Sequence, residues 1–313
     1  MLNIAGDPVE YARQRGLLDA GERPAVEWLA GGVACSVVRL HARRGAIVIK
    51  QAQEKFRVQE EWLVDPRRNI LEARFQTLAR EALGNDHVPA VLDVDGDNFA
   101  YTMASAPENA QSWKTMLLQG DVRPELGAQC GELLVKLQSI PAEEFLRGKT
   151  LFYQQRIEPY FEFTAKRHPD VERELAAVSE RLMARSETVT HGDYTPKNFL
   201  VANGTLILLD YEVVHIGWPE FDIASIVNHL TLKMFHLPKH RDALCKTAEK
   251  FLGTLSPRDG WLECFGGLML ARVDGKSPAE YLRETDKPRI RELAKRLLRG
   301  EFSSYKSFQS GAF

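Results

Sequence analysis

The chain has 313 residues, of which 44% are hydrophobic and 27% are charged, and its formal net charge at pH 7 is −2. This composition is typical of a globular protein that can bury a sizeable core as one large domain or two lobes. The near-neutral charge excludes a global basic field for nucleic acid and a polybasic block for a membrane surface, so we expect small-molecule partners.

No targeting segment is predicted at the beginning of the chain. Residues 1–10 lack a positive segment followed by an apolar one, and no apolar run reaches the ~20 residues that span a bilayer. The four cysteines are scattered without Cys-x-x-Cys spacing, which indicates neither a disulfide framework nor a zinc site. We therefore expect a cytoplasmic protein, and its oligomeric state stays open.

The first predicted elements are a helix over residues 8–18, with Asp7 as its N-cap, and two strands within residues 25–44. Gly31 and Gly32 lie between these strands. Glycines there let backbone N–H groups approach phosphate oxygens closely, although a plain hairpin would carry the same residues. Gly31 and Gly32 are therefore candidates for nucleotide contacts.

A strand over residues 45–50 ends in Lys50, and a lysine on an otherwise buried segment needs an anionic partner. A helix is predicted to begin with Asp65 as N-cap and Pro66 at its first position, and Glu72 lies in its first turns. The alternative is a surface lysine and an ordinary acidic residue near a helix start. The expected apolar stripe of this helix consists of Ile70, Leu71, Phe75, Leu78 and Ala82.

Two further strands are predicted over residues 89–92 and 98–103, and beyond Pro107 the pattern becomes helical. This change predicts a boundary between an N-terminal lobe of residues 1–107 and a C-terminal lobe of residues 108–313. Helices are expected over residues 113–118 and 124–139. In the aromatic stretch 151–165, Glu158 and Glu162 are four residues apart and either bind an amine or face solvent.

The most informative stretch is residues 190–198, Thr-His-Gly-Asp-Tyr-Thr-Pro-Lys-Asn, followed by a predicted β-hairpin around Asn203-Gly204. Because a hairpin returns the chain, Asn198 at its entry and Asp210 at its exit should lie side by side. An amide oxygen and a carboxylate there suit Mg²⁺. Since side chains alternate along a strand, Glu212 should share the face of Asp210, either as a further metal ligand or as a residue that supports the ligands.

Asp193 lies in the loop before the hairpin. A carboxylate held close to the metal but not on it can accept the proton of an attacking hydroxyl and orient that hydroxyl toward a phosphoryl group. Lys197 either contacts the γ-phosphate or is exposed to solvent. Together these residues indicate phosphoryl transfer, and the alternative is a loop whose acidic residues merely face solvent.

The succession of His191-Gly192-Asp193, Asn198 and Asp210 resembles the catalytic core of aminoglycoside phosphotransferases and their small-molecule kinase relatives. The resemblance implies an α+β, protein kinase-like two-lobed fold with a small antiparallel-sheet N-lobe and a larger, mainly helical C-lobe. It also implies ATP or GTP as phosphoryl donor, Mg²⁺ as cofactor, and a hydroxyl of a small polar metabolite or antibiotic as acceptor. Asp193 would be the catalytic base, and Asn198 and Asp210 the metal ligands.

The same resemblance assigns further residues. Lys50 would hold the α- and β-phosphates and pair with Glu72, although Glu60 and Glu61 are also near in sequence. The main chain of the hinge at residues 103–106 would contact the nucleotide base, which makes Met103 and Ser105 candidates. Asp222 would brace the catalytic loop.

Further observations on the sequence bear on the predicted small-molecule kinase. Lys50-Gln51-Ala52 and residues 87–91 resemble, in part, the methylthioribose kinase branch of the superfamily. Between Asp210 and Asp222 the sequence has no Asp-Phe-Gly, no Ala-Pro-Glu and no spacer of activation-loop length, which argues against a protein kinase. A catalytically silent nucleotide-binding module of the same fold is the alternative to an active kinase. Residues 303–313 are expected to fray.

Overall fold

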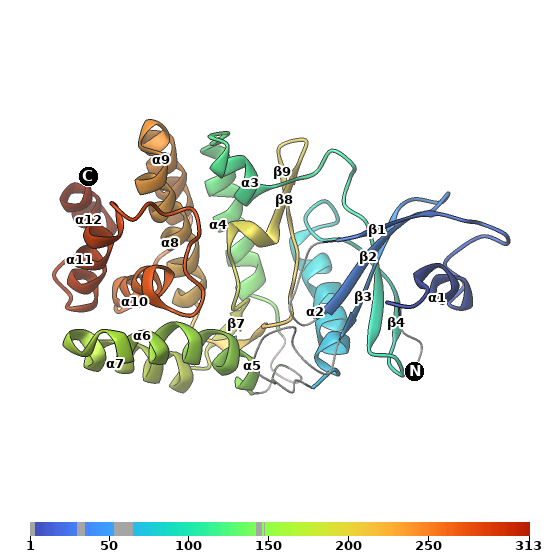
Figure 1. The fold of residues 1–313 in the computed structure, drawn as a ribbon, viewed down its shortest axis with the longest axis horizontal. Helices are drawn as coiled ribbons and strands as arrows, with labels where there is room; N and C mark the ends of the chain where they lie inside the picture. The colour runs from blue at the N-terminus through green and yellow to red at the C-terminus, as the bar shows by residue number, and fades with distance from the viewer. Residues whose placement is uncertain (1–3, 30–34, 53–64, 142–145, 147) are drawn as a thin grey trace. The chain divides into compact units, whose positions relative to one another are not determined.

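A computed structural model of the chain describes residues 4–29, 35–52, 65–141, 146 and 148–313. The chain divides into two compact units. The first unit consists of Met1–Ala110 together with Ile207–Glu212, and the second consists of Gln111–Leu206 together with Val213–Phe313. The first unit is built on a β-sheet and the second mainly on helices (Figure 1).

The sheet of the first unit has five antiparallel strands in the order β1-β2-β3-β5-β4. This confirms the predicted antiparallel sheet of the N-lobe. The strands are β1 (Ala25–Trp28), β2 (Cys35–His41), β3 (Ile47–Ala52), β4 (Val91–Asp95) and β5 (Ala100–Ala104). The helices of this unit are α1 (Pro8–Gln14) and α2 (Arg68–Leu83).

Strand β3 places Lys50 on the α2 side of the sheet. Its side chains alternate between the two faces, and Ile47 and Ile49 belong to the apolar cluster that α1 forms with the sheet through Tyr11. Lys50 therefore projects from the opposite face, and Figure 1 shows α2 beside the sheet and α1 on its other side. As predicted, Asp7 caps α1, and its side chain accepts hydrogen bonds from the backbone N–H groups of Val9 and Glu10, but the helix ends at Gln14.

Helix α2 differs from its prediction in its start and in its buried face. It begins at Arg68, and Leu71, expected in an apolar stripe, is 43% exposed. Phe75 is buried, as predicted, but the buried face also carries polar side chains. Asn69 Nδ2 donates to the carbonyls of Lys50 and Phe99, each at 2.9 Å. Asn69 thus supplies a donor to two backbone carbonyls, and a buried carbonyl without a hydrogen-bond partner would lower the stability of the fold.

The second unit contains most of the helices. Helices at Trp113–Leu118 and Glu125–Gln138 confirm the predictions for residues 113–118 and 124–139. No helix that the structure describes is long and apolar enough to cross a membrane. The longer helices are α3 (Trp113–Leu118), α4 (Glu125–Gln138), α7 (Glu172–Ala184), α8 (Glu220–His236), α9 (Arg241–Leu252), α10 (Trp261–Asp274), α11 (Lys287–Leu298) and α12 (Tyr305–Ala312).

The prediction that the C-terminus frays is wrong. Residues 305–312 form α12, which begins with a capping box between Ser304 and Ser307. Tyr305 and Phe308 are buried, and both rings contact Phe265 of α10. Burial of these two aromatic side chains stabilises a segment whose sequence is weakly periodic.

The aromatic stretch forms a helix with an unusual centre. Between α5 (Thr150–Phe152) and α6 (Phe163–Arg167), residues 153–162 form the π-helix η1 (Tyr153–Glu162). Glu158 pairs with Lys276 at 2.7 Å, and Glu162 accepts a hydrogen bond from the Tyr153 hydroxyl at 2.9 Å. Each carboxylate therefore has a partner of its own within the protein.

The polar face of α2 yields a stability prediction. We expect Asn69→Leu to lower the free energy of unfolding by roughly 2 kcal/mol, because two buried carbonyls each lose a donor. Leu71→Asn is the matched control at an exposed position of the same helix and should change it by less than about 0.5 kcal/mol. Urea denaturation measures both variants, and equal effects would contradict the assignment of the buried face.

Candidate active site

The predicted hairpin after the catalytic loop is present. Strands β8 (Phe199–Ala202) and β9 (Thr205–Leu208) are neighbours in a sheet of order β6-β8-β9, where β6 is Gln111–Ser112. Asn203 and Gly204 have φ of 52° and 80°, as a two-residue hairpin turn with both central residues left-handed requires. Asn198 belongs to the second unit and Asp210 to the first, so the two groups of site residues are described separately.

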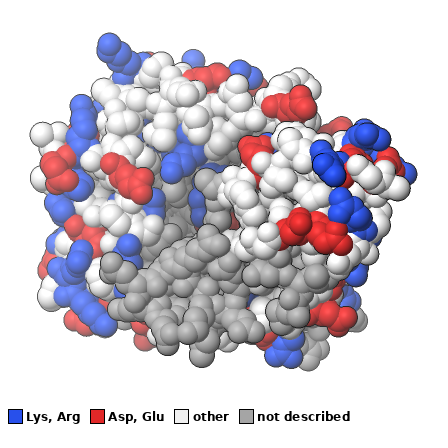
Figure 2. Space-filling model, turned by 45° about the vertical axis from the view of Figure 1, so that its right-hand side comes forward, with Lys and Arg blue, Asp and Glu red and all other residues white. Residues whose placement is uncertain are grey.

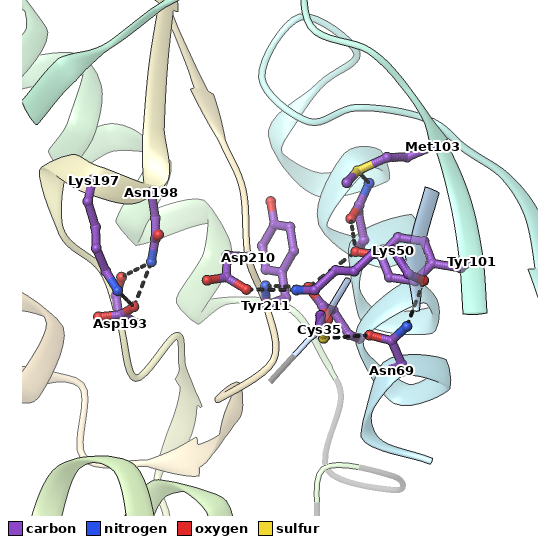
Figure 3. A network of polar contacts seen from close by, with 12 residues as sticks. Cys35, Lys50, Asn69, Tyr101, Met103, Asp193, Lys197, Asn198, Asp210 and Tyr211 are labelled. Carbon is purple, nitrogen blue, oxygen red and sulfur yellow. Dashed lines mark hydrogen bonds and ion pairs between the residues drawn. The ribbon is translucent and has the colours of Figure 1, made fainter. Parts of the chain in front are cut away.

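In the first unit, Lys50 lies between two carboxylates. Its Nζ is 2.7 Å from Glu72 Oε1 and 2.9 Å from Asp210 Oδ1 (Figure 3). The Lys50 side chain is 9% exposed and that of Glu72 is fully buried. Burial disfavours the charged lysine, but Asp210 and Glu72 outweigh it and raise the pKa of Lys50. Glu60 and Glu61, the other candidate partners, lie outside the described residues.

Glu72 connects three segments of the first unit. Besides Lys50, its Oε1 accepts hydrogen bonds from the Tyr101 hydroxyl and from the Tyr211 backbone N–H, both at 3.2 Å. Burial raises the pKa of Glu72 to about 7; Lys50 opposes this shift, and the charges of Asp210 and Glu212 add to it. Asp210 adopts φ of 67°, an uncommon backbone conformation for a non-glycine residue, which fits a constrained functional position.

The other candidate nucleotide contacts are the hinge residues, which the structure describes, and two glycines, which it does not. At the hinge, the Ser105 N–H donates to the Ala46 carbonyl at 2.9 Å, so that donor is engaged within the unit. Met103 pairs with Val48 and Val91 in the sheet, and its Sδ lies 3.5 Å from Gln76 Nε2. Gly31 and Gly32 lie outside the described residues.

In the second unit, a buried carboxylate fixes the backbone of the catalytic loop. Asp222, in the first turn of α8, accepts hydrogen bonds from the N–H groups of His191 at 2.7 Å and Gly192 at 3.0 Å. Burial raises the pKa of Asp222 to about 7, although both hydrogen bonds oppose the shift. Gly192 has φ of 76°, and a Cβ there would lie 2.8 Å from the Val213 carbonyl oxygen. Only glycine fits this position without strain.

Asp193 follows directly and is 7% exposed. Its Oδ1 lies 2.9 Å from an Arg156 Nη atom, and its Oδ2 lies 2.7 Å from Lys197 Nζ and 2.8 Å from Asn198 Nδ2. Figure 3 shows the Lys197 and Asn198 contacts. Burial alone would raise the pKa of Asp193, but the charges of Arg156 and Lys197 and these hydrogen bonds hold it well below its usual value. The carboxylate is therefore a stable anion.

Arg156 is a site residue that the sequence analysis missed. It lies in the π-helix η1, and its Nε also donates to the Gly192 carbonyl at 2.7 Å. It therefore contacts both the backbone of the catalytic loop and its carboxylate. π-Helical segments occur frequently at functional sites. In the sequence Arg156 stands in an aromatic stretch without any motif that would have singled it out.

A cavity of about 200 Å³ opens beside Asp193 within the second unit. Its wall includes Arg156 and Lys197 and, from farther along the chain, His229, Arg272 and Tyr281. A larger hollow of about 460 Å³ elsewhere in this unit is lined by Arg258 and by the two carboxylates that pair with it, Glu187 and Glu220. The smaller cavity holds the chemically informative groups, so we take it as the candidate active site.

The predicted metal ligands have suitable chemistry. Asn198 uses its Nδ2 toward Asp193, which leaves the amide oxygen as the atom for a cation. Asp210 and Glu212 supply carboxylates, and Mg²⁺ takes oxygen ligands of both kinds. The residues that the structure describes include no cluster of three or more His, Cys, Asp or Glu side chains that would hold a metal by themselves. The donor set therefore fits a metal that is also bound by substrate phosphates.

Solved structures with the same architecture define the class of fold. A choline/ethanolamine kinase family protein from Mesorhizobium loti matches with a TM-score of 0.56 at 17% identity, covering 99% of this chain and 92% of that protein. An amicoumacin kinase in complex with AMP-PNP and Ca²⁺ matches with a TM-score of 0.57 at 14% identity, covering 97% of each chain. The protein has the kinase-like phosphotransferase fold, as predicted.

The sequence places the chain more closely. The profile of the phosphotransferase enzyme family, APH, matches residues 28–245, and the chain belongs to this family. The methylthioribose kinase of Pectobacterium atrosepticum is 25% identical over 269 residues, covering 75% of this chain. The chain spans 66% of the length of that relative. The predicted resemblance to aminoglycoside phosphotransferase-like kinases is thus confirmed.

The geometry at Gly192 yields a prediction with an internal control. Gly192→Ala should lower the free energy of unfolding by about 3 kcal/mol or more, because backbone strain adds to a clash with Val213. Gly204→Ala shares the positive φ but has no atom within 4 Å of the added Cβ, so it should cost only about 1 kcal/mol. Chemical denaturation compares the two variants, and equal losses would show that the close approach to Val213 is unimportant.

Proposed function

We propose that this chain transfers the γ-phosphoryl group of ATP, or of GTP, to a hydroxyl of a small polar molecule in a Mg²⁺-dependent reaction. The observation that carries the proposal is Asp193: a buried carboxylate, kept ionised by two cations, that borders a cavity. A group of this kind can orient an acceptor hydroxyl and take its proton. Family membership and the fold support the same chemistry.

On the donor side, we assign the α- and β-phosphates to Lys50, held in place by Glu72. Mg²⁺ would be bound through Asn198, Asp210 and Glu212 together with the phosphates, and it would neutralise their charge. Lys197 would contact the γ-phosphate, which fits its 52% exposed side chain beside Asp193. Main-chain atoms around Met103 and Ser105, and those of Gly31 and Gly32, complete the proposed nucleotide site.

In the transfer step, the acceptor oxygen forms a bond to the γ-phosphorus. The bond between that phosphorus and the β–γ bridging oxygen breaks, and its electron pair leaves with the nucleoside diphosphate. The hydroxyl proton passes to the Asp193 carboxylate. Since the pKa of Asp193 is depressed, it is a weak base, and we infer that it orients the hydroxyl and accepts the proton late in the step.

Relatives support the choice of nucleotide and acceptor by analogy. The amicoumacin kinase was solved with AMP-PNP and Ca²⁺, which supports an adenine nucleotide with a divalent cation here. The methylthioribose kinase relative suggests a sugar-like acceptor. We propose a cytoplasmic enzyme because ATP is available there.

The proposal predicts that Asp193→Asn separates nucleotide binding from turnover. At ~100 times Kd, Mg²⁺-ATP should still stabilise the variant by ~2.7 kcal/mol, because Asp193 does not hold the nucleotide. Acceptor-dependent release of ADP should fall about 10²–10⁴-fold, because the acceptor loses its base. Thermal unfolding and a coupled ADP assay measure the two quantities.

Asp242→Asn, at an exposed position of helix α9, is the matched control and should leave both readouts unchanged. Unchanged turnover in Asp193→Asn would remove Asp193 from the mechanism. Stabilisation by Mg²⁺-ATP without turnover of any acceptor by the unmodified chain would favour the catalytically silent module instead. No stabilisation by either nucleotide would overturn the proposed function itself.

Arg156 yields a prediction about pH dependence. Its charge lowers the pKa of Asp193, so the unmodified enzyme should keep an ionised base down to about pH 4. In Arg156→Met, only Lys197 and the hydrogen bond from Asn198 still oppose burial, so the pKa of Asp193 rises and activity should be lost at a higher pH as the solution is acidified. Arg156→Lys retains the charge and should restore part of the profile. The measurement is kcat/KM between about pH 4 and pH 8, and superimposable profiles would contradict this role.

A further inference from the structure

The cavity beside Asp193 has more positive than negative charge. Arg156 and Lys197 both contact the single carboxylate of Asp193. Lys114 and Arg272 also line the cavity, and among the described residues neither has a carboxylate within ion-pair distance. The other acidic side chain of the wall is Glu280, which is exposed. Figure 2 shows mixed charges on the face it draws, so this excess is a local property of the cavity.

Lys114 and Arg272 are joined by a third basic side chain without a carboxylate partner in the described part of the chain, and it lies behind the wall of the cavity. Lys233 of α8 is fully buried, and its Nζ donates to the His229 carbonyl at 3.2 Å and lies 5.1 Å from the centre of the Tyr281 ring. No carboxylate among the described residues pairs with it. Burial, together with the charges of Lys114 and Arg272, lowers the pKa of Lys233 to about 7, and an anion nearby would favour its charged form. Three helices thus bring three cations together where an anion would relieve their repulsion.

The same wall carries buried polar atoms that lack a hydrogen-bond partner within the described part of the chain. They are the Tyr281 hydroxyl, Asn228 Oδ1 and Arg272 Nε. Buried polar groups are normally satisfied, and groups that are not point to a ligand or to water. A donor, an acceptor and a guanidinium together suit a molecule with several hydroxyl groups and an anionic group.

We propose that the phosphoryl acceptor is an anionic hydroxy compound, a sugar or polyol that carries a carboxylate or phosphate. Its negative group would bind Lys114 and Arg272, with Lys233 behind them, while its hydroxyl lies at Asp193. This inference rests on the proposed function and narrows its acceptor. Cationic acceptors such as amino alcohols and aminoglycosides are disfavoured, because like charges in a partly buried site repel.

The phosphates of the nucleotide offer another source for an anion in this cavity. In the proposed reaction these phosphates lie at Lys50 and at Lys197, and Lys197 forms an ion pair with Asp193. Lys114 and Arg272 have no contact with Asp193 among those described, and they belong to α3 and α10. Measurement of KM for the acceptor and for ATP separately distinguishes the two sources.

The experiment compares three classes of acceptor in a transfer assay with labelled ATP, together with thermal shift in Mg²⁺-ADP. The anionic probes are D-ribose 5-phosphate, D-gluconate and D-glycerate, the neutral probe is D-ribose, and the cationic probes are choline and kanamycin. We expect transfer to, or stabilisation by, an anionic probe in preference to all others. Lys114→Met and Arg272→Met should each raise KM for that probe, or its Kd, about 30-fold and leave KM for ATP within about twofold.

Lys250→Met is the control, an exposed lysine of α9 outside the cavity, and should change neither constant. Preferred transfer to a neutral or cationic probe would overturn the inference while the proposed function stands. Absence of both transfer and stabilisation with every anionic probe would also overturn it, as would a selective rise in KM for ATP in the two variants. The proposed function fails separately, if Mg²⁺-ATP does not stabilise the chain.

Discussion

The catalytic loop depends on one buried carboxylate. Asp222 accepts hydrogen bonds from two consecutive backbone N–H groups, those of His191 and Gly192, and thereby fixes a conformation with positive φ that only glycine adopts without strain. The next side chain in the sequence is Asp193, so its direction is set by the backbone that Asp222 holds. Arg156 adds a second constraint by binding the Gly192 carbonyl and the Asp193 carboxylate at once. The loop is therefore held mainly through its backbone, which leaves the Asp193 side chain to face the cavity.

Much of this arrangement could be predicted from local sequence. Asn203-Gly204 specifies a hairpin turn because both residues tolerate left-handed backbone, and β8 and β9 indeed pair. A lysine at the end of an apolar strand requires an anionic partner, and Lys50 has Glu72. These predictions succeeded because each rests on a constraint that acts within a few residues or on a charge that cannot be buried alone.

The errors arose where tertiary contacts override local pattern. Helix α2 was expected to bury an apolar stripe. Phe75 of that stripe is buried but Leu71 is exposed, and the buried face also carries Asn69, Glu72 and Gln76, whose partners periodicity cannot reveal. Helix α12 was expected to fray, yet two of its aromatic residues are buried against α10. Arg156 was missed because a π-helix changes which residues share a face, and sequence spacing is normally read with an α-helical period.

The two units carry charge imbalances of opposite sign, and this asymmetry links the fold to the proposed chemistry. In the first unit Lys50 is surrounded by Glu72 and Asp210, and Glu212 adds a third carboxylate whose charge reaches Glu72. Such an excess of negative charge favours a divalent cation. In the second unit, the cavity at Asp193 has an excess of positive charge. Each imbalance lowers the stability of the unliganded protein, and a ligand of the opposite charge offsets it. We therefore infer that the two units are arranged in advance to bind a metal ion and an anionic acceptor.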